Sequence, residues 1–167
     1  MSTIAHPAPR RLASFALASV PGNERVALDQ VAASVATLNV APDRLNRLKT
    51  AVAEATMNAI EHGNGGRPDL AVGIEVLQSG ADVVVTITDH GGRHDEGWSE
   101  DQAEIPDLAR KLEGQQDPRG WGLFLIRHMV DALDVTTAGE YRTVRLTIQI
   151  GPAPQGPVGG TCVPGAP

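Results

Sequence analysis

Residues 54–63 read EATMNAIEHG, and they are the most informative stretch of this chain. They end a segment that starts at Pro42 and whose apolar residues recur at i, i+3 and i+4 steps, as on one face of a helix. We expect a helix from Pro42 to about His62, with proline in its first turn and a glycine-rich run at its end. Glu54, Asn58 and His62 are spaced four residues apart. They should therefore lie roughly above one another, on a stripe offset from the apolar one.

Glu54 and Asn58 would place a carboxylate and a carboxamide together on a partly covered helix face. Mg²⁺ prefers oxygen ligands and takes few of them from protein, with water and phosphate completing its shell. Asn58 could therefore supply a neutral oxygen to such a cation, and Glu54 a base or a water-orienting group. The same spacing also suits a solvated polar helix face, so this motif alone leaves both interpretations open.

A second polar group follows an expected strand over residues 83–87, where residues 88–92 read TDHGG. An acid at the end of a buried strand can accept a hydrogen bond from a ligand amine. The N6 amino group of adenine fits Asp89, whereas a triphosphate would be repelled by it. Gly91 would let the backbone approach the base closely. A simple turn that closes the strand needs the same residue types, so it remains the alternative.

A third group, residues 119–123 with the sequence RGWGL, opens a further expected helix. Backbone N–H groups at a helix N-terminus attract phosphate, and Gly120 and Gly122 would keep side chains out of its path. Arg119 adds a donor that can bind phosphate in a bidentate manner. A plain loop-to-helix junction is the alternative interpretation.

The hydrophobic pattern sets these three groups in an order of strands and helices. The expected strands span about residues 11–20, 72–76 and 83–87, with two more on either side of Ala138 and Gly139, the last ending at Ile150. The expected helices span about residues 23–38, 42–62 and 120–133, with a short one at 105–112. Short turns between strands predict a mixed, mostly antiparallel sheet covered on one face by about three helices, which is a two-layer α/β sandwich.

Composition divides the chain into one domain and two flanking segments. Residues 1–10 have little pattern and are expected to be a flexible arm, and residues 11–150 form the domain. The proline- and glycine-rich residues 151–167 are expected to be disordered. Within the domain, the polar and acidic stretch at about residues 90–118 is expected to be a lid.

The charge and cysteine content exclude several function classes. With a net charge of −6 and a pI near 5.3, the domain is a poor candidate for nucleic-acid binding, which depends on phosphate contacts. Cys162 is the one cysteine, so no disulfide can form within the chain. No stretch has the apolar length of a signal peptide or a membrane span. We therefore expect a cytoplasmic protein without direct contact to nucleic acid or membrane.

The three groups together resemble the motifs of a known family. Residues 54–63, the Asp89-x-Gly91 pair and residues 120–126 (GWGLFLI) resemble the N, G1 and G2 boxes of GHKL ATP-binding domains. More narrowly, NAIEHGN at 58–64 and GWGLFLIRHMVD at 120–131 are similar to bacterial anti-sigma-factor serine kinases of the RsbW and SpoIIAB type. The likeness covers about residues 12–150. The sequence holds no Walker-type phosphate loop, H-R-D catalytic loop or G-x-S-x-G elbow.

The resemblance implies a Bergerat-type (GHKL) sandwich that binds ATP and Mg²⁺. Asn58 would hold Mg²⁺ against the phosphates, and Glu54 would be the base that activates an acceptor serine. Asp89 would bind adenine, with Gly91 close to the base. The residues lining the phosphate side beneath a mobile lid would be Gly120, Gly122 and Leu123. Further candidates for nucleotide binding are His62, Arg119 and Thr143.

The resemblance also implies partners for a serine/threonine protein kinase. The protein substrate would be a serine on a STAS-type anti-anti-sigma protein, and the other partner would be a sigma factor that the kinase sequesters. Kinases of this type are commonly homodimers.

Some segments depart from the family pattern. Residues 89–94 read DHGGRH where the family usually has D-x-G-x-G-[FY], and residues 141–144 read YRTV where it often has G-T-x-V. The expected lid holds six carboxylates from Asp95 to Asp107. The altered G1 pattern and the acidic lid favour an alternative, an ATP-binding partner-switch module without efficient phosphoryl transfer. A histidine-kinase-like catalytic domain is a weaker alternative, because no dimerisation and phosphoacceptor helix pair is visible in the sequence.

Overall fold

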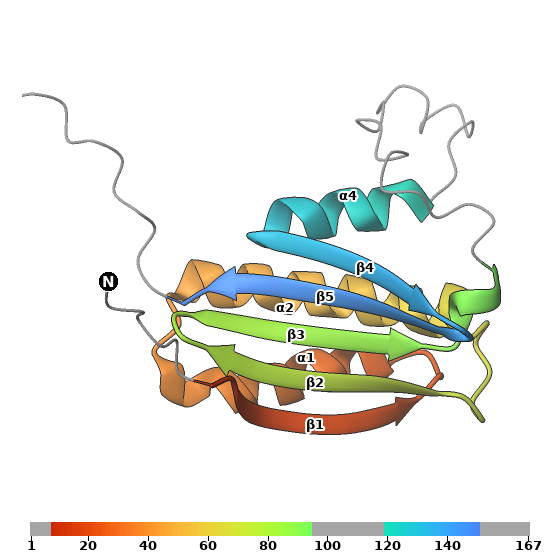
Figure 1. Cartoon of the computed structure of the whole chain (residues 1–167), viewed down its shortest axis with the longest axis horizontal. Helices are drawn as coiled ribbons and strands as arrows, with labels where there is room; N and C mark the ends of the chain where they lie inside the picture. Colours follow the sequence, from red (N-terminus) through yellow and green to blue (C-terminus); the bar gives the residue numbers. More distant parts are fainter. Residues whose placement is uncertain (1–7, 95–118, 151–167) are drawn as a thin grey trace, which may run out of the picture.

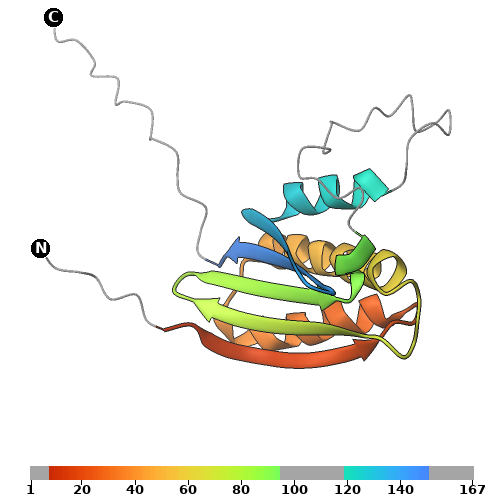
Figure 2. The same cartoon turned by 45° about the vertical axis from the view of Figure 1, so that its right-hand side comes forward.

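The structure, a computed structural model, describes residues 8–94 and 119–150. In these ranges it has two layers, a five-stranded sheet and three α-helices that cover one face of it (Figures 1 and 2). The strands are β1 (Arg10–Ala18), β2 (Ala71–Ser79), β3 (Asp82–Asp89), β4 (Ala132–Ala138) and β5 (Tyr141–Gln149). The helices are α1 (Asn23–Val35), α2 (Pro42–Asn58) and α4 (Arg119–Met129). The short 3₁₀ or π turns are η1 (Ala36–Leu38), η2 (Ala59–Gly63) and η3 (Gly91–His94).

The strands lie in the order β1-β2-β3-β5-β4, and each described pair of neighbours is antiparallel. The expected two-layer α/β sandwich is confirmed, but its described strands form an antiparallel sheet rather than a mixed one. Gly80 (φ 59°) and Gly139 (φ 63°) adopt the left-handed conformation in the turns that join β2 to β3 and β4 to β5. Because β5 returns between β3 and β4, it brings Arg142 beside Asp89, from which it is distant in sequence.

The core lies between the sheet and the helices and consists of aliphatic side chains. Alternate residues of β2, β3 and β5 face it, and the residues between them face the open side of the sheet. The buried strand residues are Val72, Ile74, Val76, Val83, Val85, Ile87, Val144, Leu146 and Ile148. The helices add Val31, Leu48, Val52 and Ile126 to the same cluster. Since only 3% of the residues are aromatic, this core depends on close packing of many small and branched side chains.

Helix α2 carries most of the motif at residues 54–63. Pro42 occupies its first turn and Asp43 adds negative charge there, and both are favourable at a helix start. Beyond Asn58 the helix widens into the π turn η2, where the N–H of Asn64 donates to the carbonyl of Ala59 over 2.8 Å. The expected single helix is therefore an α-helix followed by one π turn. Such π turns occur frequently at functional sites.

The third expected helix is shorter than predicted. Leu133, expected on its apolar face, lies in β4 instead. The N–H of Asp131 donates to the carbonyl of Thr147 over 2.9 Å. The Asp131 carboxylate accepts hydrogen bonds from the N–H of Gln149 (2.8 Å) and from Arg44 (3.0 Å). These bonds draw the chain into the ladder with β5, so tertiary pairing overrides the local helical period.

The remaining expectations concern the ends of the domain and the lid. Strand β1 begins at Arg10, one residue before the expected domain boundary. The short helix expected at 105–112, most of the expected lid and the segments 1–7 and 151–167 lie outside the described residues. No described helix combines the length and hydrophobicity that crossing a membrane requires.

Candidate functional site

Three segments that are distant in sequence meet at one end of the sandwich. The end of α2 with its π turn η2, the end of β3 and the start of α4 all lie on the right-hand side of Figure 1. The turn between β4 and β5 reaches the same end. The three polar groups recognised in the sequence therefore belong to one region of the fold.

Gly122 of α4 lies directly against the polar ends of Glu54 and Asn58. A Cβ atom added to Gly122 would lie 3.0 Å from Nδ2 and 3.3 Å from Oδ1 of Asn58, and 3.4 Å from Oε2 of Glu54. Contacts this short would force the neighbouring atoms to give way. The absence of a side chain at Gly122 thus allows α4 to approach the two polar groups of α2.

The Glu54 and Asn58 side chains are half-buried and one helical turn apart on α2. Within the described ranges neither side chain forms a hydrogen bond or an ion pair with another residue. A carboxylate and a carboxamide oxygen that converge in this way are hard donors of the kind that fit Mg²⁺. The described residues contain no group of three or more His, Cys, Asp or Glu side chains that could hold a metal ion.

The start of α4 brings backbone amides to the same place. Arg119 and Gly120 are its first residues, so Gly120 and Gly122 lie within its first turn rather than in a turn before it. The free N–H groups of a helix start attract anions, and Gly122 keeps that approach clear of side-chain atoms. The side chain of Leu123 packs against the core, so this residue contributes its backbone to the site. The Arg119 side chain lies outside what the structure describes.

Asp89 ends β3 with its side chain fully buried. Its Oδ1 atom accepts a hydrogen bond from the N–H of Gly91 (2.7 Å). Its Oδ2 atom accepts two from Arg142, from Nη2 at 2.8 Å and from Nε at 3.2 Å. A Cβ atom on Gly63 would overlap the Asp89 carboxylate, and one on Gly91 would lie 2.7 Å from Oδ1. The backbone at residues 63 and 91 can therefore pack this closely against the carboxylate only because neither residue has a side chain.

Asn64 is a positioning residue that the sequence analysis did not single out. It is 2% exposed, and its Oδ1 atom accepts a hydrogen bond from the N–H of His90 (2.7 Å). Its Nδ2 atom donates to Ser19 Oγ (2.8 Å) and to the carbonyl of Ala71 (3.2 Å). One amide thus ties the segment after η2 to the residues that follow β1 and β3 and to the start of β2. The available signal in the sequence was an asparagine directly after Gly63, where the helix ends.

The segment after Asp89 forms the 3₁₀ turn η3. A Cβ atom on Gly92 would lie 2.7 Å from the carbonyl oxygen of Gly139, and the N–H of Gly92 donates to the carbonyl of Glu140 over 3.1 Å. The second glycine of this segment therefore packs η3 against the turn between β4 and β5. It occupies the region where the chain departs from the usual G1 pattern.

Within the described residues, the side chains of His62 and Thr143, two of the nucleotide-binding candidates, form no hydrogen bond or ion pair with Glu54, Asn58 or Asp89. His62 is exposed in the π turn η2. Thr143 pairs across the sheet with Thr88, and their hydroxyl groups are 3.1 Å apart. Since Asp89 and Arg142 face the helices and successive strand residues alternate, Thr88 and Thr143 face the open side of the sheet. The inward position next to Thr143 is held by Arg142.

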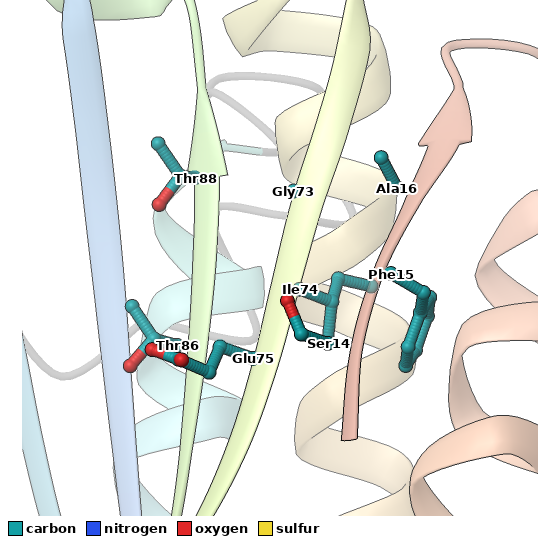
Figure 3. A pocket seen from close by; sticks show the side chains of 8 residues that line it. All are labelled: Ser14, Phe15, Ala16, Gly73, Ile74, Glu75, Thr86 and Thr88. Atoms are coloured by element: carbon teal, nitrogen blue, oxygen red, sulfur yellow. The ribbon is translucent and has the colours of Figure 1, made fainter. Parts of the chain in front are cut away.

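A shallow hollow lies on that open face, over β1, β2 and β3. Figure 3 shows its lining, with the helices behind the strands: Ser14, Phe15, Ala16, Gly73, Ile74, Glu75, Thr86 and Thr88. Its one carboxylate, Glu75, pairs with Arg11 at 3.0 Å. The hollow and the Glu54–Asn58–Gly122 cluster lie on opposite sides of the sheet. The cluster is the candidate site, because it joins two of the polar groups that the sequence pointed to and the hollow joins none of them.

Comparison with known families agrees with this geometry. The family model described as "Histidine kinase-like ATPase domain" matches residues 17–148. The chain belongs to the histidine kinase-like ATPase family. Membership of this ATPase family implies that the domain binds ATP.

Curated relatives identify a narrower branch. The "Anti-sigma F factor" of Oceanobacillus iheyensis is 34% identical over 139 residues, which is 82% of this chain and 91% of the relative. The "Anti-sigma F factor" of Anoxybacillus flavithermus is 34% identical over 125 residues, 74% of this chain and 82% of the relative. The family resemblance found in the sequence is thereby confirmed.

Solved structures agree on the fold. The RsbU and RsbW domains of a Mycobacterium tuberculosis protein superpose with a TM-score of 0.58 at 16% identity, covering 86% of this chain and 32% of that one. The SiaB–SiaC complex of Pseudomonas aeruginosa gives a TM-score of 0.56 at 19% identity, covering 83% of this chain and 90% of the matched one.

Proposed function

We infer that this chain is an anti-sigma factor with serine/threonine protein kinase activity. It binds ATP with Mg²⁺, sequesters a sigma factor and phosphorylates a serine on a STAS-type anti-anti-sigma protein. The single observation that carries the proposal is the convergence of Glu54 and Asn58 on Gly122 in the first turn of α4. The similarity to curated anti-sigma F factors supports the sigma-factor partner.

The phosphate end of the nucleotide would lie between α2 and the start of α4. Asn58 would supply one oxygen ligand to Mg²⁺, and the amides of the first turn of α4, together with Arg119, would bind phosphate oxygens. When bound, Mg²⁺ neutralises charge on the phosphates. Catalysis of phosphoryl transfer is mainly positioning and charge neutralisation, so a small domain can perform it.

Glu54 acts as the general base of the proposed transfer. The serine oxygen of the partner attacks the γ-phosphorus, the bond from that phosphorus to the β–γ bridging oxygen breaks, and the serine proton passes to the Glu54 carboxylate. ADP leaves with the bridging oxygen. Glu54 fits this role because its carboxylate is half-buried beside Asn58 and is not engaged by another described residue.

The base end would lie at Asp89. The Asp89 carboxylate would accept a hydrogen bond from the N6 amino group of adenine, and the absence of side chains at Gly63 and Gly91 lets the backbone pack closely around this carboxylate. The phosphate-binding amides and the proposed Mg²⁺ ligand Asn58 lie at the α2–α4 end, so the nucleotide would bind with its phosphates there and its base at Asp89.

The base assignment is tested by comparing Glu54→Gln with wild type. We expect phosphate transfer from radiolabelled ATP to a STAS-domain protein from the same genome to fall by about 100-fold or more, as for loss of a general base. ATP affinity should change by less than about threefold, because the substitution keeps the shape of the side chain. Glu61→Gln is the matched control, since Glu61 is an exposed carboxylate of the next turn. Transfer by Glu54→Gln at the wild-type rate would remove Glu54 from this role.

A second candidate function is an ATP-binding partner switch without efficient phosphoryl transfer. The observation that favours it is the packing of Gly92 against the β4–β5 turn, in the segment that departs from the family pattern. This candidate predicts ATP-dependent binding of a sigma factor with no phosphorylation of any STAS-domain partner tested.

A further inference from the structure

The buried pair of Asp89 and Arg142 has a geometry that affects the proposed nucleotide site. Arg142 donates from both Nε and Nη2 to Oδ2 of Asp89, at 3.2 and 2.8 Å. The Asp89 side chain is 0% exposed and that of Arg142 is 5% exposed. The two residues are cross-strand partners on β3 and β5, so the arginine reaches the carboxylate from the neighbouring strand.

The hydrogen-bonding capacity of Asp89 is nearly exhausted by these partners. An ionised carboxylate offers about four lone-pair positions. Arg142 fills two of them and the N–H of Gly91 fills a third, so both oxygens are engaged. One position on Oδ1 is left, but the carboxylate is fully buried and already pairs with the charged Arg142, so a ligand amine gains little by reaching Asp89.

The register of β5 explains how an arginine comes to be there. Val144 is buried, so the residue two positions before it points to the same side of the sheet. This inward position belongs to Arg142, and Thr143 points outward. A threonine hydroxyl would leave most of the carboxylate available to a ligand. A guanidinium satisfies the carboxylate before any ligand arrives.

We propose that Arg142 is a specificity-determining residue that relaxes the choice of base in this nucleotide site. By satisfying Asp89 internally, it removes most of the gain from a hydrogen bond between the carboxylate and the N6 amino group of adenine. A site discriminates strongly against an analogue only when the missing group leaves a buried polar partner unpaired. Purine nucleoside triphosphates with a 6-oxo group therefore bind nearly as well as ATP. This inference rests on the proposed placement of the base at Asp89.

The test compares the dissociation constants of ATP and ITP, measured with Mg²⁺ by calorimetry on the full chain. ITP replaces the 6-amino group with a 6-oxo group. For wild type we expect a preference for ATP of less than about threefold. For Arg142→Thr we expect tighter ATP binding and a preference of about tenfold or more, the size of a hydrogen bond to a charged group.

Two further variants separate base selection from a purely structural role. Arg142→Lys keeps a cation beside Asp89 and should keep the wild-type ratio. Arg145→Thr makes the same change at an exposed arginine of β5 that faces the other side of the sheet, and should also leave the ratio unchanged. Thermal unfolding of each variant checks that it folds. The ratio of the two dissociation constants for the wild-type protein tests the inference even if Arg142→Thr does not fold.

The outcomes distinguish this inference from the proposed function. A wild-type preference for ATP of about threefold or more, or a folded Arg142→Thr protein with an unchanged ratio, would overturn the role of Arg142 while leaving ATP binding intact. A folded wild-type chain that binds neither nucleotide would overturn both.

Discussion

The two polar centres at this end of the sandwich differ in how their groups are satisfied. At the α2–α4 centre, Glu54 and Asn58 are half-buried and, within the described residues, engaged with no other side chain. At the β3–β5 centre, Asp89 is fully buried and holds three hydrogen bonds from Gly91 and Arg142. The polar groups of the first centre are available to a ligand, whereas those of the second already pair with each other.

This difference separates the forces that hold the fold from those that would hold a nucleotide. A buried ion pair contributes through the high cost of breaking it, because removal of one partner leaves an uncompensated charge. An open carboxylate and amide contribute little to folding but remain available for a cation and phosphate. We therefore expect changes at the β3–β5 centre to act mainly on stability, and changes at the α2–α4 centre to act mainly on binding.

The largest expected effect on stability is that of Asp89→Ala. It would remove the carboxylate that accepts two hydrogen bonds from the buried Arg142 guanidinium, and we expect a loss of about 3–5 kcal/mol in the free energy of unfolding. Urea denaturation followed by circular dichroism measures this loss. Asp82→Ala, at the other end of the same strand, is the matched control and should cost less than about 1 kcal/mol. Equal losses in the two variants would mean that the buried ion pair contributes no more to the free energy of unfolding than Asp82 does.

A smaller loss is expected for Gly63→Ala. The added Cβ atom would overlap the Asp89 carboxylate, and overpacking of this kind costs about 1–3 kcal/mol. The control is Gly73→Ala on β2, where the nearest atom to the added Cβ lies at an ordinary 3.9 Å. If both alanine variants unfold at the wild-type urea concentration, the close approach of the π turn to Asp89 is not a constraint on this fold.

The smallest effect is expected at the α2–α4 centre. There a substitution should lower ATP affinity without lowering stability. Gly122→Ala places a Cβ atom 3.0 Å from Asn58 and 3.4 Å from Glu54, so we expect ATP affinity to fall about tenfold, or 1.4 kcal/mol. Stability should stay the same or rise by up to about 1 kcal/mol, because alanine favours a helix more than glycine does. Calorimetric titration and thermal unfolding of one preparation give both numbers. A parallel fall in both would remove the distinction between the two centres.

Much of the fold was predictable because its signals are local. The apolar stripe of α2 and the alternation of β2, β3 and β5 follow from residue spacing. Leu133 was misassigned because it continues a helical period, whereas the hydrogen bonds of Asp131 to Arg44 and β5 decide where α4 ends. Those partners are distant in sequence, so no local window contains them.

The candidate site was predictable in its parts but less so in its connections. The convergence of Glu54, Asn58 and Gly122 depends on how α4 packs on α2. The pairing of Asp89 with Arg142 depends on the register between β3 and β5. One signal was available: because Val144 fits the core, alternation alone would have placed Arg142 inward and Thr143 outward.

The most direct test of the central claim, that α2 and α4 form the nucleotide–Mg²⁺ site, is calorimetric titration of ATP with and without Mg²⁺ into wild type and Asn58→Ala. Asn46→Ala is the matched control, since Asn46 is an exposed asparagine of the same helix. We predict that Mg²⁺ strengthens ATP binding by about tenfold or more in wild type and in the control, and by less than about threefold in Asn58→Ala. An Asn58→Ala protein with the full wild-type response to Mg²⁺ would contradict the account.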